Sequence, residues 1–185
     1  TFANWLLVFV MKKIFLKLEV SNGFDLENLP TIESPKYIAI GNSITNGLGT
    51  TGNSSHLTYP FLVKEELGYE LFNWGVGGSK VYDGLLANLS TGITPELVTV
   101  LWGYNDVHFS GNDQYLRMNT FPQYAILLDS ICSTFPDANV VAILPTYTTD
   151  PYNTAHRNID SLRIGELKII EELQMAHDKL NPHFA

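Results

Sequence analysis

The stretch Tyr37–Gly49, which reads YIAIGNSITNGLG, decides how the rest of the chain is interpreted. Tyr37 to Ile40 is a short apolar run rich in residues that favour β-structure, and Gly41 breaks it. This pattern predicts a buried strand that ends just before Ser43. Because open α/β sheets bind ligands beyond the carboxyl ends of their strands, Ser43 is a candidate reactive residue. Taken alone, a serine at this position is also typical of a helix N-cap.

Two further blocks follow later predicted strands. One reads NWGVGG at residues 73–78, and the other reads GYND at residues 103–106. Because the carboxyl ends of parallel strands meet at one edge of a sheet, both blocks are expected to lie near Ser43, although about 30 residues separate each from the next. Taken alone, the glycines are also typical of a tight turn or a phosphate-binding loop. Asn105 and Asp106 are likewise typical of a cap or an Asx-turn.

Together, the three blocks resemble those of the SGNH hydrolases, a family of serine esterases and lipases, over Lys36 to about Asp160. The first resembles the GDSL motif, with Asn42 in the place of aspartate, and the third matches Gly-x-Asn-Asp. The resemblance implies a flavodoxin-like three-layer α/β/α sandwich with a parallel sheet. It also implies that Ser43 attacks an acyl carbonyl. The backbone N–H groups of Ser43 and Gly78 and the side-chain amide of Asn105 would then stabilise the oxyanion.

The residue types suit these implied roles. A glycine lets a backbone N–H approach a ligand without a side chain in the way. An asparagine amide is a neutral donor at any working pH. Removing one such donor typically lowers the rate about 10²- to 10³-fold.

The family's histidine base, which the resemblance places in a late Asp-x-x-His block, has no counterpart, since the sequence contains no Asp-x-x-His. His108 and His156 are predicted at the catalytic edge, where a surface or substrate-contacting role is the favoured interpretation of each and a substitute base is the alternative. A last helix over about Ile159 to Leu180 would carry His177 and His183 to the opposite edge. This interpretation leaves the sheet without its last strand and predicts a C-terminally incomplete domain.

The wider pattern is an alternation of strands and helices from Lys36 onward, which indicates a parallel sheet covered on both faces. The predicted strands are 37–40, 70–73, 97–102 and 139–144, and the predicted helices are 57–67, 122–134 and 159–180. Residues 34–185 would form the hydrolase-like domain. Residues 1–33 are predicted to be a β-rich or irregular segment, the remnant of an upstream β-domain. Their apolar run, Trp5 to Val10, is far shorter than the roughly 20 residues that span a bilayer.

The composition argues against several classes of partner and cofactor. A formal net charge of -8 with 11 basic residues argues against a nucleic-acid surface. The single cysteine, Cys132, excludes an internal disulfide and is expected in the core. The sequence has neither His-x-x-x-His nor paired cysteines, and it lacks the full G-x-G-x-x-G spacing, so neither a metal nor a nucleotide cofactor is expected.

The predicted activity is serine-dependent hydrolysis of carboxylic esters, with short acyl groups on a carbohydrate or another small alcohol as the favoured substrates. Aromatic residues cluster near the predicted site and suit a sugar ring, although aromatics at strand ends are more often core; they are Tyr59, Trp74, Tyr82, Trp102, Tyr104 and Phe109. The alternative is a non-catalytic ligand-binding module of the same family, or an inactive fragment of an esterase.

Overall fold

The structure is a computed structural model that describes residues 33–81, 92–110, 112–146, 159–177 and 180–184. All but the first of these residues belong to one compact unit, Ser34–Ala185, and the description below concerns that unit alone. The segment predicted for residues 1–33 lies outside the described residues apart from Glu33.

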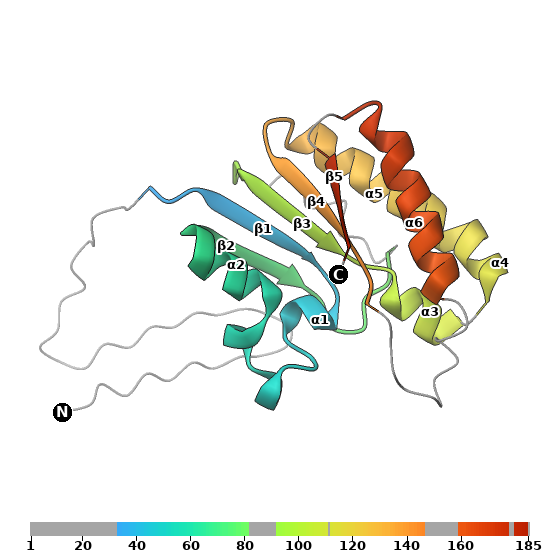
Figure 1. Cartoon of the computed structure of the whole chain (residues 1–185), viewed down its shortest axis with the longest axis horizontal. Helices are drawn as coiled ribbons and strands as arrows, with labels where there is room; N and C mark the ends of the chain where they lie inside the picture. The colour runs from blue at the N-terminus through green and yellow to red at the C-terminus, as the bar shows by residue number, and fades with distance from the viewer. Residues whose placement is uncertain (1–32, 82–91, 111, 147–158, 178–179, 185) are drawn as a thin grey trace, which may run out of the picture. The chain divides into compact units, whose positions relative to one another are not determined.

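The centre of the unit is a five-stranded sheet with the order β2-β1-β3-β4-β5, in which every neighbouring pair is parallel (Figure 1). The strands are β1 (Lys36–Gly41), β2 (Glu70–Gly75), β3 (Leu97–Leu101), β4 (Asn139–Leu144) and β5 (Leu180–Phe184). The first four confirm the predicted strands to within two residues at each end. All five residues of β3 are buried, as expected for a central parallel strand covered on both faces.

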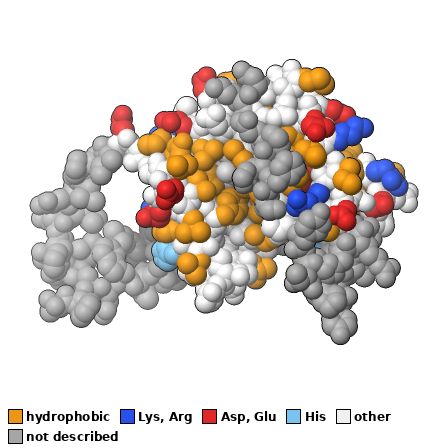
Figure 2. Space-filling model, in the orientation of Figure 1, with side chains coloured by type: hydrophobic (Ala, Val, Ile, Leu, Met, Phe, Trp, Pro, Cys, Tyr) orange, Lys and Arg blue, Asp and Glu red, His pale blue; other side chains and the backbone are white. Residues whose placement is uncertain are grey.

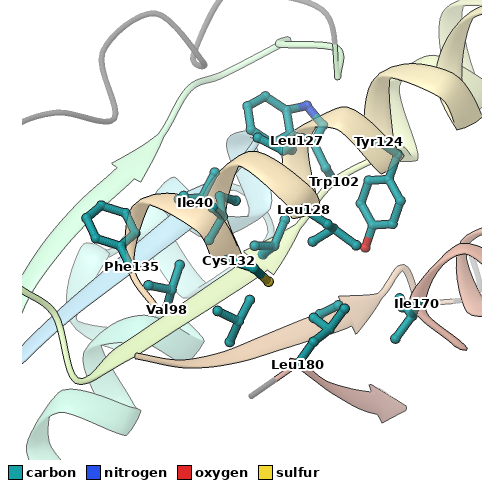
Figure 3. Packing of buried hydrophobic residues seen from close by; sticks show 14 of the residues in the cluster. Ile40, Val98, Trp102, Tyr124, Leu127, Leu128, Cys132, Phe135, Ile170 and Leu180 are labelled. Carbon is teal, nitrogen blue, oxygen red and sulfur yellow. The ribbon is translucent and has the colours of Figure 1, made fainter. Parts of the chain in front are cut away.

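Helices cover the two faces of this sheet and make three layers. Side chains alternate along β1: Ile38 and Ile40 pack into the main core with α5 (Phe121–Thr134) and α6 (Ile159–Gln174). Figure 3 shows α5 residues lying over strand residues in this core. Tyr37 and Ala39 face the other way, in a smaller cluster with Val63 of α2 (Tyr59–Leu67). The predicted α/β/α sandwich is therefore confirmed.

Shorter helical elements follow the strands and loops. They are α1 (Ser43–Asn46), η1 (Thr51–Asn53), η2 (Ser55–Leu57), α3 (Tyr104–Ser110), α4 (Asp113–Tyr115) and the π-helical turn η4 (Leu116–Thr120). Helix α2 ends as predicted, because Gly68 adopts a left-handed backbone conformation and its N–H donates to the carbonyl oxygen of Lys64. Cys132 is buried in the main core, also as predicted.

The C-terminal prediction is wrong in one respect. Helix α6 ends at Gln174 rather than near Leu180, and the chain turns where the N–H groups of Ala176 and His177 both donate to Leu173. Strand β5 then pairs with β4, so the sheet does have a fifth strand. Pro182 lacks the N–H that a helix interior or a central strand requires, but an edge strand such as β5 tolerates it.

On the face shown in Figure 2, hydrophobic side chains gather centrally and charged side chains lie toward the periphery. Among the described residues, no helix is both long enough and apolar enough to cross a membrane.

Candidate active site

The strand β1 delivers Ser43 to the carboxyl edge of the sheet. β1 ends at Gly41, Asn42 is the N-cap of α1, and Ser43 is the first residue of that helix. The Oδ1 atom of Asn42 accepts a hydrogen bond from the N–H of Ile44 at 2.9 Å. An aspartate oxygen would cap the helix in the same way, so the asparagine keeps the local geometry.

This arrangement overturns the interpretation of Ser43 as a helix cap, because Asn42 fills that role. Ser43 is half-buried, and its hydroxyl has no hydrogen-bond partner among the residues that the structure describes. The turn that begins with Ser43 is tightly packed against Gly41 and the end of β3. A Cβ on Gly41 would overlap Thr45 Oγ1 and would lie 2.5 Å from the carbonyl oxygen of Leu101. Gly41 therefore lets the first turn of α1 lie against the end of β3.

The second block lies beside this turn. The N–H of Val76 donates to the carbonyl oxygen of Gly41 at 3.0 Å. A Cβ on Gly75 would lie 2.7 Å from the nitrogen of Asn46, and a Cβ on Gly77 would lie 4.0 Å from Ser43 Cβ. The glycines thus allow this loop to approach the serine closely.

Gly78, the predicted donor of this block, is exposed and has a φ of 75°. This left-handed conformation favours glycine. Its N–H donates no hydrogen bond to any of the described residues. The next residue, Ser79, is buried and turns back on the loop, since its N–H and hydroxyl both donate to the carbonyl oxygen of Val76 at 3.2 and 2.8 Å.

The third block joins the second through Asn105. This side chain is buried in α3, and its Nδ2 donates to the carbonyl oxygen of Ser79 at 2.8 Å. An amide nitrogen carries two hydrogens, so one N–H remains for another acceptor. The structure thus brings the loops of Ser43, Gly78 and Asn105 together at the carboxyl edge of the sheet (Figure 1).

Asp106 ties the same two loops together from the buried side. Its Oδ2 accepts from the N–H of Val81 at 3.3 Å, and its Oδ1 accepts from Thr120 Oγ1 at 3.1 Å. Burial raises the pKa of this carboxyl from 3.8 to about 6, against the opposing effect of these hydrogen bonds and of Lys80.

Of the histidines considered as candidate bases, those that the structure describes lie at different edges of the sheet. His108 lies on α3, beyond the end of β3, and is exposed, with its ring stacked at 6.1 Å on Tyr104. His156 lies outside the described residues. His177 lies before β5, at the opposite edge as predicted, and contacts Asp129 at 2.9 Å. The placement of His183 was wrong, because β5 runs back toward the carboxyl edge and pairs this residue with Ile143.

Sequence reasoning missed the residues that support the three blocks. Asn73 was quoted as part of the second block, but its bridge between two loops had no signal in the sequence. Nδ2 donates to the carbonyl oxygen of Thr45, and Oδ1 accepts from the N–H of Gly75, each at 2.9 Å. Of the aromatic residues considered for a sugar, Trp102 is fully buried in the core, while Tyr82 and the side chain of Phe109 are not described. Within the described ranges, no group of three or more His, Cys, Asp or Glu side chains could hold a metal ion.

Comparison with known proteins identifies the family. Residues 39–171 match the model of the GDSL-like lipase/acylhydrolase family, and the chain belongs to that family. A comparison with curated protein sequences found no significant match.

Solved structures share the fold. The chain is similar to a family two carbohydrate esterase from Clostridium thermocellum in complex with cellohexaose, with a TM-score of 0.69 and 18% identity over 92% of this chain and 59% of that one. It is also similar to the acetyl xylan esterase Est2A from Butyrivibrio proteoclasticus, with a TM-score of 0.65 and 15% identity over 85% of this chain and 56% of that one. The W215I variant of Axe2, an acetyl xylan esterase from Geobacillus stearothermophilus, gives a TM-score of 0.52 and 25% identity, over 75% and 72% of the two chains. The chain thus spans less than two thirds of the length of the first two of these proteins.

Proposed function

We propose that the site hydrolyses carboxylic esters and that Ser43 is the nucleophile. The observation that carries this proposal is the convergence of three loops at one edge of the sheet. Ser43 Cβ lies 4.0 Å from the position of a Cβ on Gly77, and Asn105 is bonded to the loop that follows Gly78. A serine that attacks an acyl carbonyl needs donors directed at the developing negative charge.

The donors in this proposal are the N–H groups of Ser43 and Gly78 and the second N–H of Asn105. Each is neutral, and Asn105 is held by its bond to Ser79. A donor that is fixed before the reaction stabilises charge without having to reorganise, which is the basis of an oxyanion hole. The attack would form a bond from Ser43 Oγ to the acyl carbon and break the bond from that carbon to the ester oxygen, and the hydroxyl proton of Ser43 would leave with the alcohol. Water would then attack the acyl carbon, break its bond to Oγ, return a proton to Oγ and release the acid.

Two exposed apolar side chains support a substrate with an apolar acyl group. Leu48 and Val76 are 59% and 48% exposed. Their backbone N–H groups donate to the carbonyl oxygens of Ser43 and Gly41 at 2.8 and 3.0 Å, so both residues flank the serine. The favoured alcohol is a carbohydrate, a choice that is supported by likeness to proteins described as carbohydrate and acetyl xylan esterases.

The test is the release of acetate from an activated aryl acetate and from an acetylated xylo-oligosaccharide, by the full chain and by Ser43→Ala. We expect turnover of both substrates by the wild type and none by the variant. Equal turnover by the two proteins, with matched circular dichroism spectra, would exclude Ser43 as the nucleophile. Turnover of the aryl acetate alone would exclude the carbohydrate substrate.

A further inference from the structure

Glu166 of α6 is fully buried, although it is an ionisable residue. Neither of its carboxyl oxygens has a hydrogen-bond partner among the described residues. Burying an ionised carboxylate without a partner costs free energy. Such a group therefore binds a proton, or it is retained because it has a role in function. The Tyr124 hydroxyl, which interacts electrostatically with Glu166, and the Trp102 indole nitrogen are also buried with no hydrogen-bond partner among the described residues. Figure 3 shows Tyr124 and Trp102 at the end of the core that is remote from Phe135.

The Glu166 carboxyl lies directly against Gly103, the first residue of the third block. A Cβ on Gly103 would overlap Glu166 Oε1 and would lie 3.0 Å from both methyl carbons of Leu162. Gly103 has a φ of 89°, and its carbonyl oxygen accepts from the N–H of Val107 within α3. The carboxyl therefore occupies the space next to a left-handed backbone turn that sets the direction of α3.

Asn105 follows this turn by two residues. Its bond to Ser79 depends on where α3 begins, and the start of α3 is packed from beneath by Glu166 and Leu162. Asp106, on the same helix turn, is held from its other side by Thr120 and by the N–H of Val81. Glu166 thus packs against the third block from within the protein, while Asp106 bonds this block to Val81 and Thr120.

The charged and titratable groups that face Glu166 are Asp106 on α3, Tyr124 on α5 and Arg163 on α6 itself. Burial raises the pKa of Glu166 well above its ordinary value, the charge of Asp106 raises it further, and Arg163 opposes both effects. The Arg163 guanidinium also donates to the carbonyl oxygen of Pro145, after β4. Of the two carboxyl groups, Glu166 is thus the one whose burial most strongly favours the protonated form.

We propose that Glu166 is a positioning residue for the reaction proposed above: its carboxyl fills the space beneath Gly103 and holds the start of α3, so that Asn105 keeps its donor at the oxyanion position. Glu166 does not touch the substrate. The inference rests on the proposed function for its effect on rate, but its effect on Asn105 is independent of any activity.

The experiment compares Glu166→Gln and Glu166→Ala with the wild type, with Glu171→Gln as a matched control, because Glu171 is exposed on the same helix. Three measurements are made: the kinetics with an aryl acetate, which give kcat and KM, the side-chain amide resonances of Asn105, and the melting temperature from pH 4 to 9. The Asn105 resonances are assigned by their loss in Asn105→Ala.

Glutamine keeps the shape of a protonated carboxyl, so Glu166→Gln should keep wild-type kcat and wild-type Asn105 resonances at pH 7. Glu166→Ala leaves the space empty. It should shift the Asn105 resonances and lower kcat about 10- to 100-fold with little change in KM, because a small displacement of a catalytic group has a large effect on rate. Glu171→Gln should match the wild type in all three measurements.

The pH arm tests the protonation of Glu166. A raised pKa means that the folded state keeps a proton which the unfolded state loses above its ordinary pKa, so stability falls as pH rises from about 4.5. Glu166→Gln removes this dependence. Its melting temperature relative to the wild type should therefore rise steadily with pH.

Unchanged Asn105 resonances and unchanged kcat in a folded Glu166→Ala variant would overturn the proposal. So would a Glu166→Gln variant that loses activity as Glu166→Ala does, or whose relative melting temperature is independent of pH. If the wild type hydrolyses no ester, the proposed function fails, and the Asn105 resonances then decide the role of Glu166. If Glu166→Ala does not fold, Glu166→Gln and its pH dependence decide it.

Discussion

Asn73 Nδ2 donates a hydrogen bond to the carbonyl oxygen of Thr45 over 2.9 Å, and this bond ties the end of β2 to the helix turn that begins with Ser43. The same side chain accepts from the N–H of Gly75 at 2.9 Å. One amide thus sets the distance between the Ser43 turn and the glycine loop.

The first prediction concerns this bridge. Asn73→Ala should lower the free energy of unfolding by about 1 to 3 kcal/mol, because it removes two hydrogen bonds. It should also lower kcat, since the Ser43 turn and the glycine loop are then no longer joined by a hydrogen bond. Chemical denaturation and aryl acetate kinetics measure both effects. Asn119→Ala is the control, because Asn119 is exposed and its side chain bonds, among the described residues, to the carbonyl oxygen of Tyr115 one turn earlier. Equal behaviour of the two variants would mean that the bridge has no role in the site.

The second prediction compares two glycines in one loop. A Cβ on Gly75 would lie 2.7 Å from the nitrogen of Asn46 and 3.0 Å from the carbonyl oxygen of Asn42, both backbone atoms, whereas Gly77 has no such neighbour. Gly75→Ala should therefore lower stability by about 1 to 3 kcal/mol, as overpacking does. Gly77→Ala should stay close to the wild type. Thermal unfolding of both variants tests this, and a larger loss for Gly77→Ala would contradict the packing described above.

The third prediction follows from the pKa of Asp106, which burial raises from 3.8 to about 6. Between these values the folded state holds a proton that the unfolded state has lost. The stabilising contribution is thus complete below pH 3.8 and is lost as pH rises through about 6. The loss over this window is about 3 kcal/mol at most, from about 1.4 kcal/mol for each pKa unit.

Asp106→Asn removes this titration. Denaturant unfolding from pH 3.5 to 7 should show the stability of the variant rising relative to the wild type up to about pH 6. A relative stability that is flat over this range would show that Asp106 titrates at its ordinary pKa.

The fourth prediction concerns Asn105, the side-chain donor in the proposed oxyanion hole. Asn105→Ala should lower kcat for an aryl acetate by about 10² to 10³, with a smaller change in KM, because the donor acts mainly in the transition state. His108→Ala on the same helix should retain activity, since its exposed ring stacks on Tyr104. A large loss in His108→Ala together with full activity in Asn105→Ala would reverse the roles given to these two residues.

The sequence predicted the elements whose patterns are local. The continuous apolar run of β3 and the Gly68 cap of α2 are examples, and the three blocks indicated where the sheet edge carries its polar residues. The features that depend on tertiary contacts were not predicted. The apolar periodicity of α6 gave no sign of the turn at Leu173, and β5 depends on pairing with β4. Glu166 belongs to a helix with several exposed charges, so nothing local distinguishes it from them, and only the packing of α6 against Gly103 reveals its burial.

The most direct test of the central claim is covalent labelling of the full chain with a fluorophosphonate, followed by peptide mass spectrometry. A fluorophosphonate forms a stable bond with an activated serine hydroxyl and expels fluoride, so the label marks the nucleophile. We predict a single adduct on the peptide that contains Ser43, and no adduct in Ser43→Ala. An adduct on another serine, or a folded wild type that forms none, would contradict the assignment of Ser43 as the nucleophile.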